Sequence, residues 1–494
     1  MLRTSDASIE LSADVRPISH DADPETLLWT DGEDAAFAAA NRGVVDASTQ
    51  LAVARALVNA GKWQEAVEPL MRLVAGTATL AARARALLAY VRYYQGDFPL
   101  GVSEADAALD LARWDGLARA EAHLYASVNL TALNDALRAE EHARKAHDAA
   151  RNVRPPGLRD DLRFRIARQL THVLVAAGHY GEGAAQAETA VELARRTRNR
   201  RNRGLASYLR AHVAAARGDS SALGYFASAI SEWGPNYEGL HRWVRYCVAC
   251  FLRDAGDAPK AHLYRVASGM RLCWEEPLFD LADAKPSAEP TPASEDERPF
   301  CLATVGLLRF LGPRPETAEQ PFAMAIAAFE SGGLHHYRRG AALGLAATYA
   351  RLGRANLARN IVRDEIIGLE RANLLRWPWW HRMVASTLAH IDPAAEASRM
   401  FQRCLAHGHA HHSQNTDAPG VPELSQRERE VIVAWLGHPG FDRPQLARLL
   451  GISEASVRNH INRVRRKLGV PARRGPDALR LRLDELRAIG AAPL

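Results

Sequence analysis

Between residues 48 and 405, apolar residues recur every three or four positions, in blocks of 12 to 16 residues separated by Gly- or Pro-containing turns. This spacing places apolar side chains along one face of an α-helix, whereas a half-buried strand would alternate apolar and polar residues. Such alternation is almost absent from this part of the chain. The pattern therefore predicts an all-α fold built from many helices of moderate length.

The turns between these helices follow a common pattern. Small residues stand seven positions before and five positions after most of the turns, where two antiparallel helices need close backbone approach. A glycine at the turn itself supplies a positive φ at little cost. The turns of this kind are at Gly61, Gly96, Gly178, Gly218, Gly256 and Gly353, with looser matches at Asn134 and Gly312.

This succession of small residue, turn and second small residue resembles the tetratricopeptide repeat over residues 48–405. The resemblance implies an α-solenoid of about nine helix pairs, the last of them formed by 375–390 and 393–405. The repeats are longer than the 34-residue consensus and often lack its aromatic residue. An acidic, Pro-rich segment within residues 276–298 interrupts the array, and its composition predicts a disordered loop.

In tetratricopeptide arrays the first helix of each pair lines a concave groove, and several of those helices are rich in Arg and His here. Acidic residues on second helices, such as Glu182, Glu188 and Glu192, would leave this groove positive and suited to an acidic peptide or protein effector. A small-molecule effector is one alternative, and solvated faces with local ion pairs are another. The acidic stretch 289–297 is an internal candidate occupant. The candidate groove residues are Arg165, Arg168, His172, Arg210, Arg242 and Arg245.

Residues 423–490 carry a different pattern of four short helices with recognisable caps. Ser425 and Glu428 form a capping box at the start of the first helix. Asp442 caps the second helix, Gly451 ends it, and Ser453 caps the third. The inward faces comprise Val431, Ile432, Trp435 and Leu436 in the first helix, Leu446, Leu449 and Leu450 in the second, and Val457, Ile461, Val464 and Leu468 in the third.

The opposite face of the third helix is basic and rich in Asn. Over residues 424–487 there are fourteen Arg or Lys against seven Asp or Glu, a charge of +7 that exceeds the +6 of the whole chain. Such a segment is a candidate for binding a polyanion. Arg reads guanine and Asn reads adenine, so Arg458, Asn459 and Asn462 are predicted to contact bases. The predicted contacts to the DNA backbone are Ser456, Arg463, Arg465, Arg466 and Lys467.

The segments 424–431, 446–460 and 461–469 resemble the LuxR/GerE-type helix-turn-helix of bacterial transcription regulators. The resemblance implies sequence-specific binding of double-stranded DNA, with Arg458, Asn459 and Asn462 at the base-facing positions and Ser456 at a phosphate-contacting one. It also implies contact with RNA polymerase and dimerisation on DNA through the fourth helix, 477–487. The unusual stretch 471–476 departs from the family pattern and puts the docking of that helix in question.

The remaining segments and patterns complete the sequence-based prediction. Residues 1–47 are predicted to be partly disordered with short capping helices, and 406–422 form a His-rich linker. No long apolar run, secretory signal or nucleotide-binding or catalytic motif occurs, and five cysteines are few, so we expect a cytoplasmic protein without membrane span, enzymatic activity or cofactor. Cys247 and Cys250 are interpreted as core residues, with no metal site. The competing hypotheses for the whole chain are a sigma-like factor and a repeat scaffold with a degenerate tail.

Overall fold

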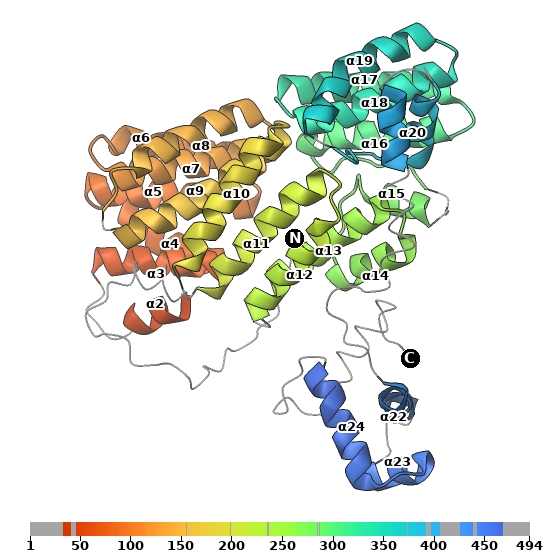
Figure 1. The fold of residues 1–494 in the computed structure, drawn as a ribbon. Helices are drawn as coiled ribbons and strands as arrows, with labels where there is room; N and C mark the ends of the chain where they lie inside the picture. The colour runs from red at the N-terminus through yellow and green to blue at the C-terminus, as the bar shows by residue number, and fades with distance from the viewer. Residues whose placement is uncertain are drawn as a thin grey trace. The chain divides into compact units, whose positions relative to one another are not determined.

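A computed structural model describes residues 33–40, 46–154, 156–197, 199–234, 237–283, 285, 287–372, 374–391, 397–405, 425–437 and 442–467. Within these ranges the regular structure is helical and contains no strand (Figure 1). No helix in this part of the chain is long and apolar enough to cross a membrane. The predicted linker 406–422 and fourth helix 477–487 lie outside the described residues, as do positions 1–32.

The array consists of consecutive helices joined by short turns, in an order that follows the predicted pairs. The helices are α2 (Glu33–Ala40), α3 (Ala47–Asn59), α4 (Trp63–Val74), α5 (Ala78–Gln95), α6 (Phe98–Leu111), α7 (Gly116–Ala132), α8 (Ala136–Ala150), α9 (Pro156–Ala176), α10 (Tyr180–Arg195), α11 (Arg200–Ala216), α12 (Ser221–Trp233), α13 (Glu238–Asp254), α14 (Ala258–Ser268), α15 (Glu276–Ala282), η2 (Glu295–Glu297), α16 (Arg298–Leu311), η3 (Pro315–Ala318), α17 (Glu319–Ser331), α18 (His335–Arg351), α19 (Ala355–Arg371) and α20 (Arg382–Ala389), followed by helical residues 397–405.

The glycine turns adopt the left-handed conformation that the sequence predicted. At the turn between α5 and α6, Gly96 has φ +78°, and the next amide, of Asp97, donates to the carbonyl of Arg92 at 3.1 Å. The Asp97 carboxylate then accepts the amide of Leu100 and caps α6. All six predicted glycines have φ between +73° and +83°, and Asn134 takes the same role with φ +62°. Gly312 differs, with an extended backbone at φ −75°.

The small residues in phase with these turns lie between the helices. Each residue seven positions before a turn is fully buried, which brings the two helix backbones close together. These residues are Ala54, Ala89, Ser127, Thr171, Ala211, Ala249 and Ala346. Two of the positions carry hydroxyl groups, and each hydroxyl has a hydrogen-bond partner. The Thr171 hydroxyl donates to the carbonyl of Ala167, and the Ser127 hydroxyl accepts a hydrogen bond from the side-chain amide of Gln169.

Two compact units make up the chain. The first contains residues 1–126, 146–163 and 196–199, and the second contains 127–145, 164–195 and 200–494. In the first unit, Phe37 of α2 packs against Ala56 of α3. Its core also holds an ion pair of 2.8 Å between Arg55 and Glu121, both of which are buried.

The second unit contains contacts between helix pairs that are far apart in the sequence. Next to the α7–α8 turn, the amide of Ala136 donates to the carbonyl of Gly332 at 2.7 Å. In the turn between α11 and α12, the carbonyl of Arg217 accepts a hydrogen bond from the backbone amide of Leu375 at 2.9 Å. A regular solenoid packs each repeat only on its neighbours, so the repeat pattern gave no indication of these contacts.

Two predictions about the array are wrong. The segment 276–298 is not a loop throughout: α15 occupies its first seven residues, and beyond it Glu289 forms a 2.7 Å ion pair with Arg309 of α16. The helix expected at 375–390 begins only at Arg382. Residues 374–381 instead form an irregular segment in which Trp379 has φ +56° and donates its indole N–H to Thr304 at 2.9 Å. The Trp379 ring packs against Phe300 of α16 and Phe329 of α17, so tertiary packing prevails over local helix propensity here.

Candidate nucleic-acid interface

Three helices, α22 (Gln426–Gly437), α23 (Arg443–Leu450) and α24 (Glu454–Lys467), pack around a small apolar core. The predicted capping box opens α22, where the amide of Ser425 donates to the Glu428 carboxylate at 2.7 Å and the amide of Glu428 donates back to the Ser425 hydroxyl at 3.3 Å. Val431 and Ile432 are fully buried in the core. Because the buried Glu428 carboxylate has this partner, the N-terminus of α22 is fixed relative to the core.

The second helix is short and is fixed at both ends. Asp442 and Gln445 form a reciprocal capping box, and Gly451 ends the helix with φ +62°. The guanidinium of Arg427 in α22 donates to the carbonyl of Leu450 at 3.0 Å, a contact that the sequence did not suggest. Leu446 is buried as predicted, but Leu449 is half exposed to solvent, which corrects its assignment to the inward face.

The third helix has one buried face and one polar face. The hydroxyl of Ser453 accepts the amide of Ser456 at 3.1 Å and caps α24, as predicted. Val457 and Val464 are fully buried, and Ile461 packs against the same core. Seven residues separate the two valines, which is about two helical turns, so their common face fixes which side of α24 points away from the domain.

The predicted DNA-contacting residues lie mainly on that outward side. Arg458, Asn459, Asn462 and Arg463 are all exposed, and their side chains make no hydrogen bond or ion pair with another residue in the described part of the domain, so their donors are available to a ligand. Ser456 is half-buried, and its hydroxyl lies 2.8 Å from that of Ser453. The side chains of Arg465, Arg466 and Lys467 lie outside the described residues, although their backbone continues α24.

Two further exposed cations of the domain were not among the predicted contacts. Arg443 opens α23 and Arg448 lies in its last turn, and both are exposed. The sequence could have indicated these two residues, because they lie on the helix that precedes α24 and is joined to it by a short turn. Arg427, in contrast, is paired with Glu430 and with the Leu450 carbonyl, so its charge is already engaged.

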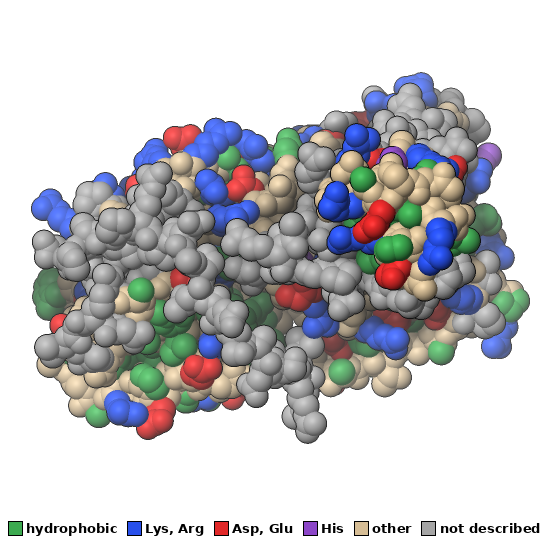
Figure 2. All heavy atoms as spheres, turned by 90° about the horizontal axis from the view of Figure 1, so that it is seen from below, with side chains coloured by type: hydrophobic (Ala, Val, Ile, Leu, Met, Phe, Trp, Pro, Cys, Tyr) green, Lys and Arg blue, Asp and Glu red, His purple; other side chains and the backbone are tan. Residues whose placement is uncertain are grey.

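The predicted positive groove in the array does not have the expected separation of charges. Arg210 forms an ion pair with Glu188, with Nε to Oε1 at 2.7 Å, and Arg245 lies 3.2 Å from Glu238. Arg242 donates to the carbonyl of Ser268 at 2.8 Å. On the face in Figure 2, basic and acidic side chains of the described residues are interspersed. Arg210 of α11 therefore meets an acid of the neighbouring helix α10, and the expected separation of acids from arginines does not hold for this pair.

The other three candidate groove residues are not exposed cations. Arg165 is buried and Arg168 is half-buried. His172 packs against the rings of Tyr208 and His212, at 5.9 and 4.7 Å between centroids. Burial, together with His212 and Arg168, holds the pKa of His172 well below its usual value, so this imidazole is neutral at pH 7.

The cysteine pair in α13 has the character of core residues. Burial raises the pKa of Cys247 to about 12 and also raises that of Cys250, which disfavours the thiolate that a metal would need. No group of three or more His, Cys, Asp or Glu side chains suited to a metal ion occurs among the residues that the structure describes.

Comparison with known proteins identifies the C-terminal domain. Residues 422–475 match the model of "Bacterial regulatory proteins, luxR family". No curated protein matches the chain. Among solved structures, the chain is similar to a Rap protein complexed with competence and sporulation factor, with 16% identity, a TM-score of 0.40, and coverage of 71% of this chain and 96% of that one.

Two other similar structures contain helical repeats as well. The APC/C hetero-tetramer Cut9–Hcn1 has 11% identity, a TM-score of 0.30, and coverage of 95% of this chain and 93% of that one. The tetratricopeptide domain of P58(IPK) has 12% identity, a TM-score of 0.22, and coverage of 76% of this chain and 100% of that one. All three TM-scores are low, so the description of the array rests on its own helix pairs and turns. The chain thus carries a luxR-family helix-turn-helix domain of bacterial regulatory proteins, which supports DNA-binding transcription regulation, after a tetratricopeptide-like helical array.

Proposed function

We propose that α24 enters the major groove of DNA and that Arg458, Asn459 and Asn462 read base edges there. The observation that carries this proposal is the division of α24 into a buried face, with Val457 and Val464 at 0% exposure, and an exposed face that bears these three side chains. Arg is suited to guanine and Asn to adenine, because each can form two hydrogen bonds with its base. The buried face fixes the orientation in which the three side chains meet the groove.

The remaining polar residues of the domain hold the phosphate backbone in this proposal. Arg463 is exposed one helical turn after Asn459, and Arg465, Arg466 and Lys467 continue the basic sequence. Arg443 and Arg448 of α23 add two exposed cations to this set. Ser456 is a weaker contributor, since its hydroxyl already lies within hydrogen-bonding distance of Ser453. Phosphate contacts of this kind position the domain but carry no sequence information.

The array is the sensing part of the protein in this proposal. An effector that binds one conformation of the array better than another shifts the equilibrium toward that conformation, and a coupled change in the DNA-binding domain then alters its affinity for DNA. The protein acts as a dimer on DNA and contacts RNA polymerase, and no catalytic step is assigned to it. The contacts between distant helix pairs in the second unit support this role, because they give the array a set of interactions that an effector can stabilise or break.

Selection of bound sequences from a random pool of DNA tests the proposal directly. The full chain is expected to enrich a defined sequence, and Asn459→Ala is expected to lose preference at one or two of its positions, at a cost of roughly 1–3 kcal/mol in discrimination. Arg359→Gln is the matched control, since Arg359 is an exposed residue of α19 in the array. Enrichment of no sequence by the folded wild-type chain, or an unchanged sequence preference in Asn459→Ala, would contradict the assignment of α24.

A further inference from the structure

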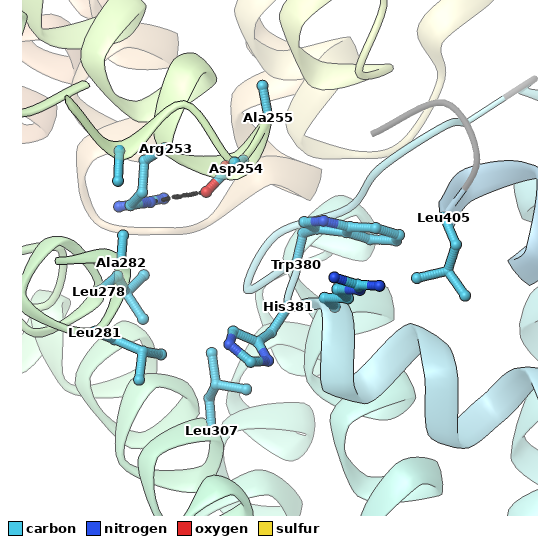
Figure 3. A pocket seen from close by; sticks show the side chains of 13 residues that line it. Arg253, Asp254, Ala255, Leu278, Leu281, Ala282, Leu307, Trp380, His381 and Leu405 are labelled. Atoms are coloured by element: carbon cyan, nitrogen blue, oxygen red, sulfur yellow. Dashed lines mark hydrogen bonds and ion pairs between the residues drawn. The ribbon is translucent and has the colours of Figure 1, made fainter. Parts of the chain in front are cut away.

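A pocket of about 420 Å³ lies in the second unit, between the C-terminal end of α13, helices α15 and α16, and the segment that leads into α20 (Figure 3). Leu405, the last described residue before the linker to the DNA-binding domain, also lines it. A cavity of this size falls within the range of pockets that hold small molecules, roughly 300–1,000 Å³. The irregular segment 374–381, which replaces the expected helix, supplies part of its wall.

Slightly more than half of the wall is apolar. Figure 3 shows Leu278, Leu281 and Ala282 of α15 on one side of the pocket, with Trp380 and Leu405 on the other. Leu307 of α16 completes this lining near His381. Such a lining favours the hydrocarbon or aromatic part of a ligand, because its burial removes apolar surface from water on both sides.

The pocket is also lined by two arginines, one of which forms ion pairs within the protein while the other does not. Arg253 forms an ion pair with Asp254 at 2.8 Å and a second with Glu275, so its charge is balanced inside the protein. Arg382 also lines the pocket, is exposed, and has no hydrogen bond or ion pair with any described residue. Its guanidinium is therefore a cation that faces this space with its donors available.

His381 adds a neutral donor beside that cation. Its Nδ1 accepts the backbone amide of Met383 at 3.1 Å and so caps α20. Burial lowers the pKa of His381, which keeps the ring neutral at pH 7 and leaves the hydrogen on Nε2. Two consecutive residues, His381 and Arg382, therefore bring together an imidazole N–H, an unpaired guanidinium and the positive N-terminal end of α20.

A further guanidinium near the pocket makes no hydrogen bond through its two terminal nitrogens within the described part of the protein. The guanidinium of Arg376 is buried, with Nη1 and Nη2 unpartnered in the described part of the protein, and it lies over the ring of Phe251 at 5.3 Å. It is near enough to Asp254, a pocket residue, for that carboxylate to influence its pKa, which burial lowers. A buried charge without a partner is costly, so an anion bound nearby would stabilise this arrangement.

We propose that this pocket binds a small amphipathic carboxylic acid, with its apolar part between α15 and Trp380 and its carboxylate at Arg382 and His381. The positive groups Arg253, Arg376 and Arg382 outnumber the acids Asp254 and Glu275, so an anionic group completes the local balance of charge. A carboxylate accepts the planar pair of N–H groups that a guanidinium offers. This inference names the effector class of the sensing role proposed above and rests on it.

Decanoate and decan-1-ol provide the probes, because they share an apolar chain and differ in charge. Isothermal titration calorimetry on the full chain, in the absence of DNA, is expected to show decanoate binding at one site and at least tenfold weaker binding of decan-1-ol. Arg382→Gln is expected to weaken decanoate binding about tenfold while leaving decan-1-ol unchanged. Arg359→Gln, on a distant exposed position, is expected to bind both as the wild type does.

A second variant tests the place of the apolar chain. Leu281→Trp puts a bulky ring into the pocket from the half-buried face of α15 and is expected to abolish binding of both probes while the thermal unfolding transition is retained. Equal affinity for acid and alcohol, no binding of decanoate, or unchanged decanoate binding by Arg382→Gln would each overturn the proposal. Because the titrations contain no DNA, such a result leaves the DNA-binding role to be judged by the selection experiment.

Discussion

The hydroxyl of Tyr180 lies 2.6 Å from Nδ1 of His336, a residue 156 positions away in the chain. Tyr180 begins α10 and His336 lies in the first turn of α18, so this hydrogen bond joins two helix pairs that are not neighbours in the repeat order. Burial raises the pKa of Tyr180 to about 12 and lowers that of His336 to about 3. Both groups are therefore uncharged at pH 7, and with the imidazole hydrogen on Nε2 the phenol O–H donates a hydrogen bond to Nδ1.

Tyr180→Phe removes this donor and leaves Nδ1 of the buried imidazole without a partner. We expect the free energy of unfolding to fall by about 1–2 kcal/mol, the usual cost of an unsatisfied buried acceptor. Chemical denaturation followed by circular dichroism measures the change. Tyr349→Phe is the matched control, because that half-buried ring lies beneath Arg354 and keeps this contact without its hydroxyl. Equal losses in the two variants would mean that the Tyr180–His336 bond contributes nothing specific.

Acidification is expected to destabilise the second unit through its buried histidines. Burial holds the pKa of His336 at about 3 and that of His212 at about 4, below the value of about 6.5 for an unfolded chain. The unfolded state therefore binds more protons between these values, so stability is fully present above pH 6.5 and is lost as the pH falls toward 4.

His336→Gln isolates the contribution of one of these groups. Between pH 7 and pH 4.5 the wild type should lose more stability than the variant, by on the order of 2 kcal/mol, because the variant has no imidazole to protonate at this position. Unfolding midpoints in urea at both pH values give the difference. An identical loss in the two proteins would contradict the assignment of a neutral buried His336.

The conformation of the glycine turns leads to a paired prediction. A Cβ at Gly96 or at Gly224 would contact no atom within 4 Å, but Gly96 has φ +78° and Gly224 lies inside α12. Gly96→Ala should therefore destabilise the protein by about 1–2 kcal/mol through backbone strain alone. Gly224→Ala should stabilise it by about 0.5–1 kcal/mol. Thermal unfolding of the two variants should shift in opposite directions, and a shift in the same direction would contradict the turn geometry.

Local patterns in the sequence predicted the turns between helices and the buried faces of individual helices. The glycine turns and the buried small residues repeat at fixed offsets, and a single helix pair is enough to impose them. The face of α24 was predictable for the same reason, since Val457 and Val464 define it by their spacing alone. In α23, two turns of helix define a face poorly, and Leu449 was assigned to the wrong side.

Long-range features escaped prediction because they depend on which helix pairs meet in space. The bond between Leu375 and Arg217 fixes an irregular segment where helical periodicity favoured a helix. The pairing of Arg210 with Glu188 joins the first helix of one pair to the second helix of the preceding pair. Counting charges on each helix separately therefore missed this pairing, which neutralises Arg210 in the packed array.

The last prediction separates phosphate contacts from base contacts on α24. Arg463 and Asn459 are both exposed and lie one helical turn apart, so neither replacement disturbs the buried face of α24. Arg463→Gln should weaken binding to specific and random DNA alike and reduce the slope of log K against log salt by about 0.9, the value for one lost phosphate contact. Asn459→Ala should weaken binding to the specific site only and leave that slope unchanged. Fluorescence anisotropy of labelled duplexes at several salt concentrations measures both effects, and a slope that changes in Asn459→Ala but not in Arg463→Gln would reverse the two assigned roles.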